Sequence, residues 1–260
     1  MTQTVHLDVQ DGLARLTLTN GKKGNPLDMS FGSEIKAAAI ELQARDDLRA
    51  VLLTAEGKNF SVGGNLASFA SVEDLPTYVR ASTADYHAAL GMLLRLRAPI
   101  VSAVQGAVAG AGVALAVFSD IVIAAEDSNF TMAYTAIGFS PDGASTYVLP
   151  RLVGMRKFQE LVLTNRTVDA NEALNIGLIT EIVPNDDLLE HAEKTARRLA
   201  SGPTQAYAAT RRLLLETFDN SLDTHLAREV ELLAAVSASD DVSEGIQAAL
   251  ERRKASFKGR

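Results

Sequence analysis

Apolar and polar positions alternate at the start of the chain. Val5, Leu7 and Val9 are separated by polar residues, and a second alternating run covers residues 13–18. The dipeptide Asp11-Gly12 lies between the two runs, and both of its residues tolerate the positive φ that a two-residue hairpin turn needs. The opening therefore predicts two antiparallel strands joined by a tight turn.

The pattern then alternates between helical periodicity and short apolar runs. Helical periodicity covers residues 28–44, where Asp28 or Ser30 can cap the first turn, and roughly residues 72–96. A third, very apolar helix is expected at 113–118. Buried strands are predicted where branched apolar residues form short runs, at 50–54, 100–104 and 120–125. Because helices interleave with strands that are apolar on both faces, the pattern indicates an α/β fold whose sheets are covered by helices.

Beyond about Arg151 the pattern becomes predominantly helical. Predicted helices lie at 169–175, 186–200, 203–218 and 240–254, with a single strand at 179–183. The best candidate boundary is Ser201-Gly-Pro203, because glycine and proline both interrupt helices. We therefore predict a core domain over about residues 1–200 and a helical C-terminal segment over about 203–260. So short a segment has only a small core of its own, so it is expected to pack on the core or on another subunit.

Composition and charge exclude several classes of protein. The 260 residues are 47% hydrophobic, which is enough to bury a full core, and the net charge of -7 offers no cationic face to a nucleic acid or an anionic membrane. The absence of cysteine rules out disulfides, iron–sulfur clusters and thiol nucleophiles. The N-terminus lacks the basic start and apolar run of a signal peptide, and no apolar run approaches the ~20 residues of a membrane helix. We expect a soluble cytoplasmic protein.

Two glycine-containing turns each follow a predicted strand. Gly110-Ala-Gly112 precedes a helix, and the first N–H groups of a helix lack internal partners at the positive end of the helix dipole. A developing oxyanion is stabilised in such a place, so this turn and Phe60-Ser-Val-Gly-Gly-Asn-Leu66 could together hold one carbonyl oxygen. Tight packing of a strand–helix turn explains the same residues. A dinucleotide loop is disfavoured, because Leu115 stands where the third glycine is required.

Asp142 lies in the turn-forming run Ser140-Pro-Asp-Gly-Ala-Ser145. Pro-Asp-Gly is a favoured turn, and an aspartate here can also cap the helix that follows. From the residues alone, a turn or a cap is favoured over a catalytic role. The histidines stand in no ligand spacing and beside no nucleophile motif, so we interpret them as surface or satisfied residues and predict no metal site. They are His6, His87, His191 and His225.

The order and spacing of several motifs resemble the enoyl-CoA hydratase/isomerase (crotonase) superfamily along essentially the whole chain. The matching stretches are Asn25-Pro-Leu-Asp28, Asn59-Phe-Ser-Val-Gly-Gly-Asn-Leu66, Ala98-Pro-Ile-Val-Ser-Ala-Val-Gln-Gly106 with Gly110-Ala-Gly112, Ser119-Asp-Ile-Val-Ile-Ala124, Phe130, Leu149-Pro-Arg-Leu-Val-Gly154, Asn171-Glu-Ala-Leu-Asn-Ile-Gly-Leu178 and Arg252-Arg-Lys-Ala-Ser-Phe257. The resemblance implies a spiral of ββα repeats with a helical C-terminal segment, assembled as a homotrimer or a dimer of trimers. It also implies an acyl-CoA thioester substrate that carries coenzyme A itself, with no separate cofactor. No metal, nucleic-acid or membrane partner is expected either, for the reasons of residue spacing, charge and hydropathy given above.

The resemblance places an oxyanion hole at the backbone N–H groups of Gly64 and Ala111. The family pattern usually reads Ala-Gly-Ala-Asp over residues 62–65 and has glycine at position 111, and both departures are mild because the backbone is the working group. Contacts to coenzyme A are implied for Lys58, Val62, Gly63, Leu66 and Arg252, the last from this chain or from a neighbouring subunit. By residue type alone, Lys58 fits a solvated loop and Arg252 fits the negative end of the last helix equally well.

Carboxylates are where the chain departs from the family's hydratases. The resemblance aligns their two glutamates with Ala114 and Tyr134, and tyrosine, with a pKa of about 10, is a poor base near neutrality. Asp142 aligns with an acidic residue of the superfamily's isomerases, and its surroundings are especially similar to the ring-epoxide isomerase of phenylacetate degradation and to Δ3,Δ2-enoyl-CoA isomerases. The resemblance thus favours an acyl-CoA isomerase with Asp142 as its single acid and base. The alternatives are a hydratase-type enzyme with other acid–base groups, and a catalytically silent acyl-CoA-binding protein.

Overall fold

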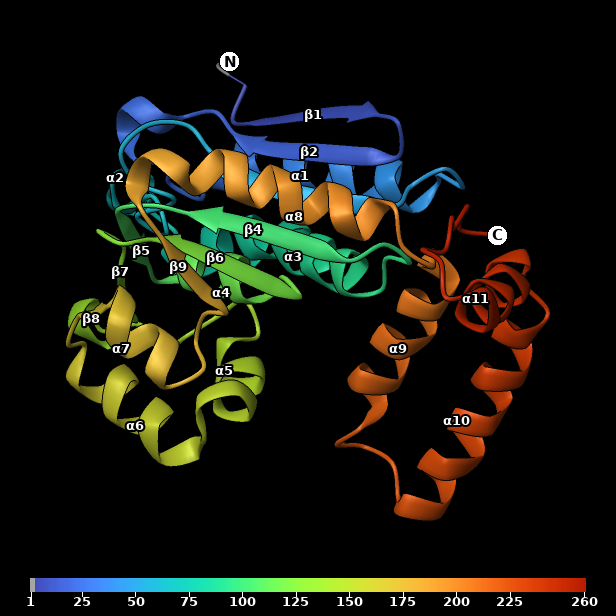
Figure 1. Ribbon diagram of the computed structural model, residues 1–260. Helices are drawn as coiled ribbons and strands as arrows, with labels where there is room; N and C mark the ends of the chain where they lie inside the picture. The colour runs from blue at the N-terminus through green and yellow to red at the C-terminus, as the bar shows by residue number, and fades with distance from the viewer. Residues whose placement is uncertain (1–2) are drawn as a thin grey trace.

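A six-stranded sheet organises the protein, which the computed structural model describes over residues 3–260. β1 is antiparallel to β2, and every other neighbouring pair in the order β1-β2-β3-β4-β6-β9 is parallel (Figure 1). The bounds are Val5–Gln10 for β1, Leu13–Leu18 for β2, Ala50–Ala55 for β3, Ile100–Val104 for β4, Ile121–Ala125 for β6 and Glu181–Val183 for β9. All the strands predicted from apolar runs lie in this sheet. Residues 1–2 of the predicted core lie outside the described range.

The predicted N-terminal hairpin is confirmed. Asp11 and Gly12 adopt φ of 52° and 77°, and the register pairs Gln10 with Leu13 across the turn. Positive φ at both turn residues matches the twist of the flanking strands. β2 contributes to both sides of the sheet, since Leu13 and Ala14 belong to different core clusters.

A smaller sheet of order β5-β7-β8 lies beside the large one (Figure 1). Its strands are β5 (Ala107–Ala109), β7 (Asn129–Thr131) and β8 (Val168–Asp169). The sequence pattern predicts none of them, because two or three residues are too few to show a period of two. A strand of the large sheet, a strand of the small sheet and a helix follow one another, as in β4, β5 and α4 (Ala111–Val117). This is the ββα repeat of a crotonase-like α/β fold.

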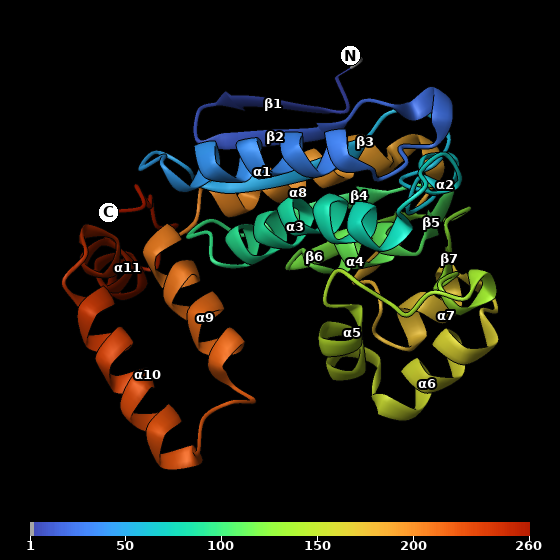
Figure 2. The same ribbon diagram turned by 180° about the vertical axis from the view of Figure 1, so that it is seen from behind.

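Helices cover both faces of the large sheet (Figures 1 and 2). α1 (Met29–Gln43) and α3 (Leu75–Leu94) pack together on one face, and α8 (Leu188–Ala200) covers the other. The side chains of β3 divide accordingly, with Leu53 in the first core cluster and Leu52 in the second. Burial on both faces explains why the strands read as unbroken apolar runs.

The starts of α1 and α3 follow their caps. Asp28 begins α1 as predicted, because its side chain accepts a 3.2 Å hydrogen bond from the N–H of Phe31. The helix predicted at 72–96 begins later, since Asp74 caps α3 by accepting a 3.1 Å hydrogen bond from the first turn. A separate short helix, α2 (Leu66–Ala70), precedes it.

Two groups of helices flank the space below the sheet (Figure 1). One comprises α5 (Ser145–Val153), α6 (Met155–Thr164) and α7 (Ala170–Asn175), and the other comprises α9 (Thr204–Glu216), α10 (Leu222–Ser237) and α11 (Asp240–Glu251). The buried Arg211 ties α9 to the sheet, because its Nε donates to Asp120 Oδ1 at 2.8 Å and its Nη1 donates to the Ala98 carbonyl at 3.0 Å. The division into a core domain and a C-terminal segment stays a prediction. No helix within residues 3–260 is long and apolar enough to cross a membrane.

Candidate active site

The two predicted N–H donors lie on neighbouring segments that run in parallel. Ser61 and Val108 form an isolated parallel bridge, in which the Ala109 N–H donates to the Ser61 carbonyl at 2.9 Å. Counting three residues forward from each partner of this bridge reaches Gly64 on one segment and Ala111 on the other. The two donors therefore occupy corresponding positions, although 47 residues separate them in the sequence.

Glycines allow the two segments to approach backbone to backbone. Gly63 has φ of +85°, and a methyl group on it would lie 2.7 Å from the Ala109 carbonyl oxygen. A methyl group on Gly112 would lie 2.7 Å from Ser61 Cβ. Both distances are shorter than real Cβ contacts, so only glycine fits at these positions. The turn glycines of the sequence thus mark a close approach of two backbones.

The N–H groups of Gly64 and Ala111 donate to no acceptor within residues 3–260. Their neighbours do donate, since the Gly110 N–H bonds to the Thr131 carbonyl at 3.0 Å and the Asn65 N–H bonds to the Leu27 carbonyl at 2.9 Å. Ala111 is the first residue of α4, where the helix dipole adds positive potential. Two donors on adjacent turns are thus available to a ligand.

A buried tyrosine fixes the start of α4. The Tyr86 hydroxyl donates to the Ala111 carbonyl at 2.9 Å, and the side chain is buried. Burial, followed by the electrostatic influence of Tyr134 and of Asp142, raises the pKa of Tyr86 well above its ordinary value. The hydroxyl therefore remains a neutral donor that holds this backbone in place.

Asp142 lies in a turn, but its side chain does not cap α5. The residues that follow it, Gly143 and Ala144, both have φ of 58°, and the N-cap position is Ala144, without a side-chain cap. The Asp142 main-chain carbonyl accepts from the Ser145 N–H at 3.0 Å, which closes the turn. The cap interpretation was wrong, because the backbone satisfies the helix start and leaves the Asp142 carboxylate for other partners.

Tyr134 is the first of these partners. Its hydroxyl donates to Asp142 Oδ1 at 2.6 Å. Burial, reinforced by the Asp142 charge, raises the pKa of Tyr134 well above its ordinary value, so the group is a neutral donor and no base. A methyl group on Gly110 would lie 3.9 Å from Tyr134 Cζ. Tyr134 thus connects Asp142 with the turn that carries Ala111.

His87, on α3, is the second partner, and the sequence reasoning missed it. His87 Nε2 lies 3.6 Å from Asp142 Oδ2 and accepts a 3.2 Å hydrogen bond from the Gly143 N–H. The expected surface position is correct, with 47% of the side chain exposed. The association with Asp142 spans 55 residues of sequence, and no local pattern signals it.

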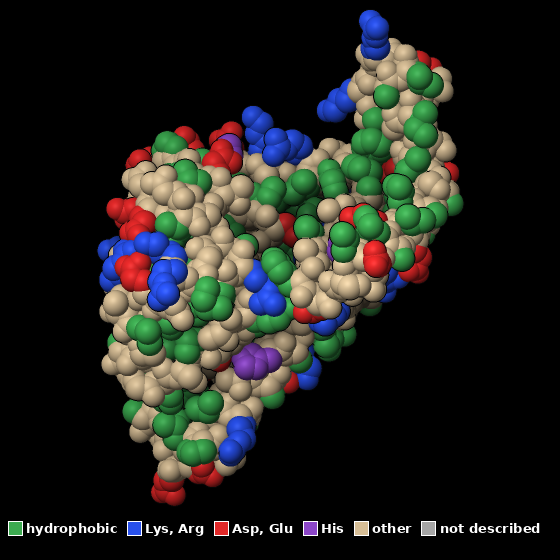
Figure 3. Space-filling view, turned by 90° about the horizontal axis from the view of Figure 1, so that it is seen from below, with side chains coloured by type: hydrophobic (Ala, Val, Ile, Leu, Met, Phe, Trp, Pro, Cys, Tyr) green, Lys and Arg blue, Asp and Glu red, His purple; other side chains and the backbone are tan. Residues whose placement is uncertain are grey.

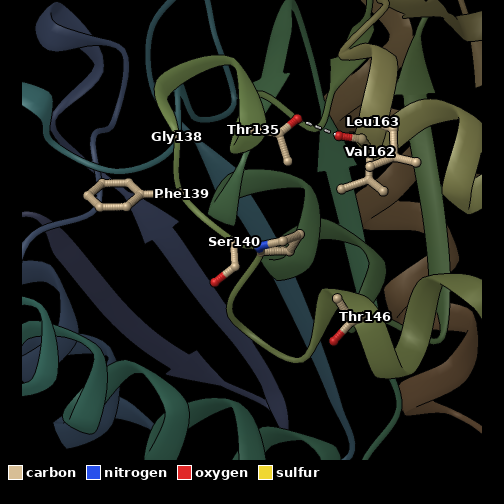
Figure 4. A pocket seen from close by; sticks show the side chains of 8 residues that line it. Thr135, Gly138, Phe139, Ser140, Thr146, Val162 and Leu163 are labelled. Atoms are coloured by element: carbon tan, nitrogen blue, oxygen red, sulfur yellow. Dashed lines mark hydrogen bonds between the residues drawn. The ribbon is translucent and has the colours of Figure 1, made fainter.

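Aromatic rings line the approach to Gly64. A methyl group on Gly64 would lie 3.1 Å from Phe69 Cε2, and the Phe69 ring makes edge contacts with Tyr78 and Phe139 at centroid distances of 6.0 and 5.5 Å. A hollow of about 360 Å³ lies beside the loop that carries Phe139, and Phe139 is one of the residues that line it. Figure 4 shows the Phe139 ring pointing away from Val162 and Leu163, which line that hollow. The contact of the Phe139 ring with Phe69 brings it near the turn that carries Gly64.

The residues expected to contact coenzyme A are only partly brought together. Val62 and Leu66, with 41% and 54% of their surface exposed, flank the buried Gly63, and the exposed Lys58 precedes them after β3. Arg252 instead ends α11, and α11 lies on the opposite side of the molecule from α2 (Figures 1 and 2). Within residues 3–260, no three potential metal-ligating side chains form a cluster.

Comparison with known proteins adds to this geometry. Residues 8–260 match the family model described as enoyl-CoA hydratase/isomerase. The chain is 37% identical to a probable enoyl-CoA hydratase of Rhodobacter capsulatus, over 99% of this chain and 98% of that protein. It is 29% identical to the 1,2-epoxyphenylacetyl-CoA isomerase of Escherichia coli, over 100% of both. A crystal structure of a Mycobacterium abscessus protein assigned to enoyl-CoA hydratase/isomerase, 33% identical, matches with a TM-score of 0.94 over 98% of this chain and 100% of that one.

Proposed function

Because this chain belongs to the enoyl-CoA hydratase/isomerase family, we propose that it is an acyl-CoA isomerase that stabilises an enolate and moves one proton with Asp142. The observation that carries the proposal is the Asp142 carboxylate, which Tyr134 connects to the turn of Ala111. The positions that the resemblance assigns to two catalytic glutamates hold Ala114 and Tyr134 instead. The chemistry proposed is therefore one that a single carboxylate can perform.

The first step would be binding of the thioester oxygen by the N–H groups of Gly64 and Ala111. These donors interact more strongly with an enolate oxygen than with a neutral carbonyl, so they lower the barrier to removing an α-proton. Loss of one such donor costs about 3–4 kcal/mol in comparable oxyanion holes. The positive end of α4 adds to the effect at Ala111.

The second step would be proton transfer by Asp142. The Cα–H bond breaks, the proton moves to the carboxylate, and the electron pair is delocalised onto the thioester oxygen. The thioester C=O then re-forms and the enolate pair becomes the double bond between Cα and Cβ. The former double bond between Cβ and Cγ breaks, and its electron pair takes the proton from Asp142 at the γ-carbon. Tyr134 holds Oδ1, which leaves Oδ2 for the proton.

Coenzyme A would be bound along Lys58, Val62, Gly63 and Leu66, with Arg252 supplied by a neighbouring subunit. The separation of α11 from α2 within one chain supports this assignment. Self-assembly into a trimer or a dimer of trimers is supported by an apolar face on α10, whose members recur at helical spacing. They are Leu222, Leu226, Val230 and Leu233, which are 50% to 74% exposed. Figure 3 shows hydrophobic side chains along the arm at the right, where the C-terminal helices lie.

Hydration is the second candidate, and His87 is the observation that favours it. Addition of water to a 2-enoyl thioester usually needs two acid–base groups, and His87 lies 3.6 Å from Asp142. The probable hydratase of Rhodobacter capsulatus, at 37% identity, points in the same direction. Asp142 and His87 would then share the work of the two absent glutamates.

A substrate panel separates the candidates. The purified protein is assayed with 3-hexenoyl-CoA for isomerisation and with 2-hexenoyl-CoA for hydration, beside Asp142→Asn and the exposed control Asp186→Asn. We expect isomerisation to be the faster reaction. Asp142→Asn should lower its kcat by about a hundredfold or more while circular dichroism shows an unchanged fold. Full activity of Asp142→Asn on 3-hexenoyl-CoA would contradict the isomerase proposal, and faster hydration would select the second candidate.

A further inference from the structure

We propose that His87 acts through Asp142 as a positioning residue that exchanges the proton of the carboxyl group with solvent. The inference rests on the role proposed for Asp142 and extends it. A single-carboxylate isomerase can carry the same hydrogen from Cα to Cγ. An imidazole beside that carboxylate allows the hydrogen to exchange with solvent instead. In D2O this exchange places deuterium in the product, where it can be measured.

The hydrogen bond from Gly143 defines the state of the imidazole. Because the Gly143 N–H donates to His87 Nε2 at 3.2 Å, that nitrogen carries a lone pair and no proton. Asp142 Oδ2, 3.6 Å away, is also an acceptor when the carboxylate is charged. Two acceptors without a hydrogen between them stay beyond hydrogen-bond distance, as is seen. A proton that arrives on Asp142 supplies the missing hydrogen.

Oδ1, the other carboxylate oxygen of Asp142, offers no comparable route for the proton. Tyr134 already donates its own proton to Oδ1 at 2.6 Å. Its raised pKa, caused by burial and by the Asp142 charge, means that it neither accepts nor gives up a proton readily. Within residues 3–260, no hydrogen bond reaches Oδ2. The proton therefore leaves from the oxygen that faces His87.

Exposure favours passage of the proton through His87. The imidazole side chain is 47% exposed, compared with 28% for Asp142, so it is the better connected to water. Nε2 gives up its hydrogen bond from Gly143 and takes the proton of the carboxylic acid, which restores the carboxylate. The imidazolium exchanges its N–H hydrogens with water, and Nε2 then returns a hydrogen from solvent to Asp142 or releases it to water and accepts the Gly143 N–H again.

The groups around His87 leave this route open. On α3, Asp85 is paired with Lys36 at 2.7 Å, and Tyr86 keeps its proton because burial raises its pKa. Asp142 is the one carboxylate within residues 3–260 that lies within 4 Å of a His87 nitrogen. His87 is therefore coupled to the proposed acid–base group alone.

A purely structural role for His87 is the competing explanation. His87 would then only anchor the turn after Asp142 by accepting the Gly143 N–H. Glutamine separates the two roles, because its amide oxygen can accept the same hydrogen bond but cannot carry a proton at neutral pH. Alanine removes both functions. His6→Gln, the same change at an exposed position on β1, is the matched control.

The test follows hydrogen exchange in D2O. Phenylacetyl-CoA, which has α-hydrogens but cannot isomerise, reports exchange by mass spectrometry, and 3-hexenoyl-CoA reports both its rate of isomerisation and the deuterium at Cγ of the product. We expect His87→Gln to lower α-exchange and Cγ deuterium by about tenfold, and to lower them more than it lowers the rate of isomerisation. His87→Ala should also slow turnover, and His6→Gln should match the wild type.

The outcomes distinguish this inference from the proposed function. Equal exchange in His87→Gln and wild type overturns the inference, whatever the isomerisation rate, and so does a wild-type protein that exchanges hydrogen with neither substrate. If phenylacetyl-CoA exchanges in a His87-dependent manner but 3-hexenoyl-CoA is not isomerised, the inference stands and the isomerase proposal fails.

Discussion

The two halves of the candidate site are built from different parts of the residues. The turns that carry Gly64 and Ala111 offer only backbone N–H groups, and glycines at 63 and 112 bring these turns together. The other half consists of the side chains of Asp142, Tyr134 and His87, which come from three separate segments. A backbone site tolerates changes of side chain but no added Cβ where the chains touch. A site made of side chains is instead sensitive to any change of those side chains.

This difference explains which departures from the family pattern matter. Val62 and Ala111 differ from the usual residues and leave the backbone N–H groups available. Ala114 and Tyr134 differ as well, and there the carboxylates themselves are gone. A chain with all four changes can therefore still stabilise an enolate. Its acid–base group, however, must differ from the two glutamates of the family pattern.

The largest effect is expected from an added methyl group in the backbone half. Gly63→Ala places a Cβ 2.7 Å from the Ala109 carbonyl oxygen at φ of +85°, so the two turns must separate. We expect kcat on 3-hexenoyl-CoA to fall about a hundredfold, the scale of losing one oxyanion donor. Strain at the positive φ should also lower the free energy of unfolding by about 1–3 kcal/mol, measured with urea.

Gly154→Ala is the control for this variant. Gly154 has a similar φ of +80°, but an added Cβ would meet nothing within 4 Å. It should show the loss of stability without the loss of kcat. If Gly63→Ala retains wild-type kcat, the contact between the turns does not matter for activity and the backbone half is wrongly placed.

The two halves also differ in how far the sequence predicted them. The turn glycines, the hairpin at Asp11-Gly12 and the cap at Asp28 were predicted because each is fixed by residues close in sequence. The side-chain half depends on contacts between distant segments. His87 meets Asp142 across 55 residues. Local rules favoured a turn or a helix cap for Asp142, and only the turn is present.

The same distinction applies to the fold. All strands of the large sheet except β9 are five or six residues long and show their burial in the sequence, whereas β5, β7 and β8 are too short to do so. β9 has only three residues and was still predicted, as part of the longer run 179–183. α10 was also missed, and its apolar residues are largely on an exposed face. The helical spacing of its apolar residues could have predicted α10 from the sequence, and only their exposure had to come from the structure.

An intermediate effect is expected from the side-chain half. Tyr134→Phe removes the 2.6 Å hydrogen bond to Asp142 Oδ1 and keeps the ring. A hydrogen bond to a charged group contributes about 1.5–3 kcal/mol, so we expect kcat to fall about tenfold as the carboxylate loses its orientation, with KM little changed. The control is Tyr147→Phe, whose exposed hydroxyl faces Asp219 Oδ2 at 3.5 Å. A tenfold rise in KM at constant kcat would instead assign Tyr134 to substrate binding.

The smallest effect is expected from a change of side chain at a residue that acts through its backbone N–H group. Ala111→Gly removes a buried methyl group at the proposed donor but keeps the N–H group and the start of α4. If the backbone alone acts, kcat and KM should stay within about twofold of wild type, and stability should fall by no more than about 1 kcal/mol, the cost of glycine in a helix. Steady-state assays beside Gly63→Ala provide the scale, because that variant adds a methyl group one residue before the other donor. A loss of kcat in Ala111→Gly as large as in Gly63→Ala would mean that the methyl group itself positions the substrate, and the division between a backbone half and a side-chain half would fail at its central residue.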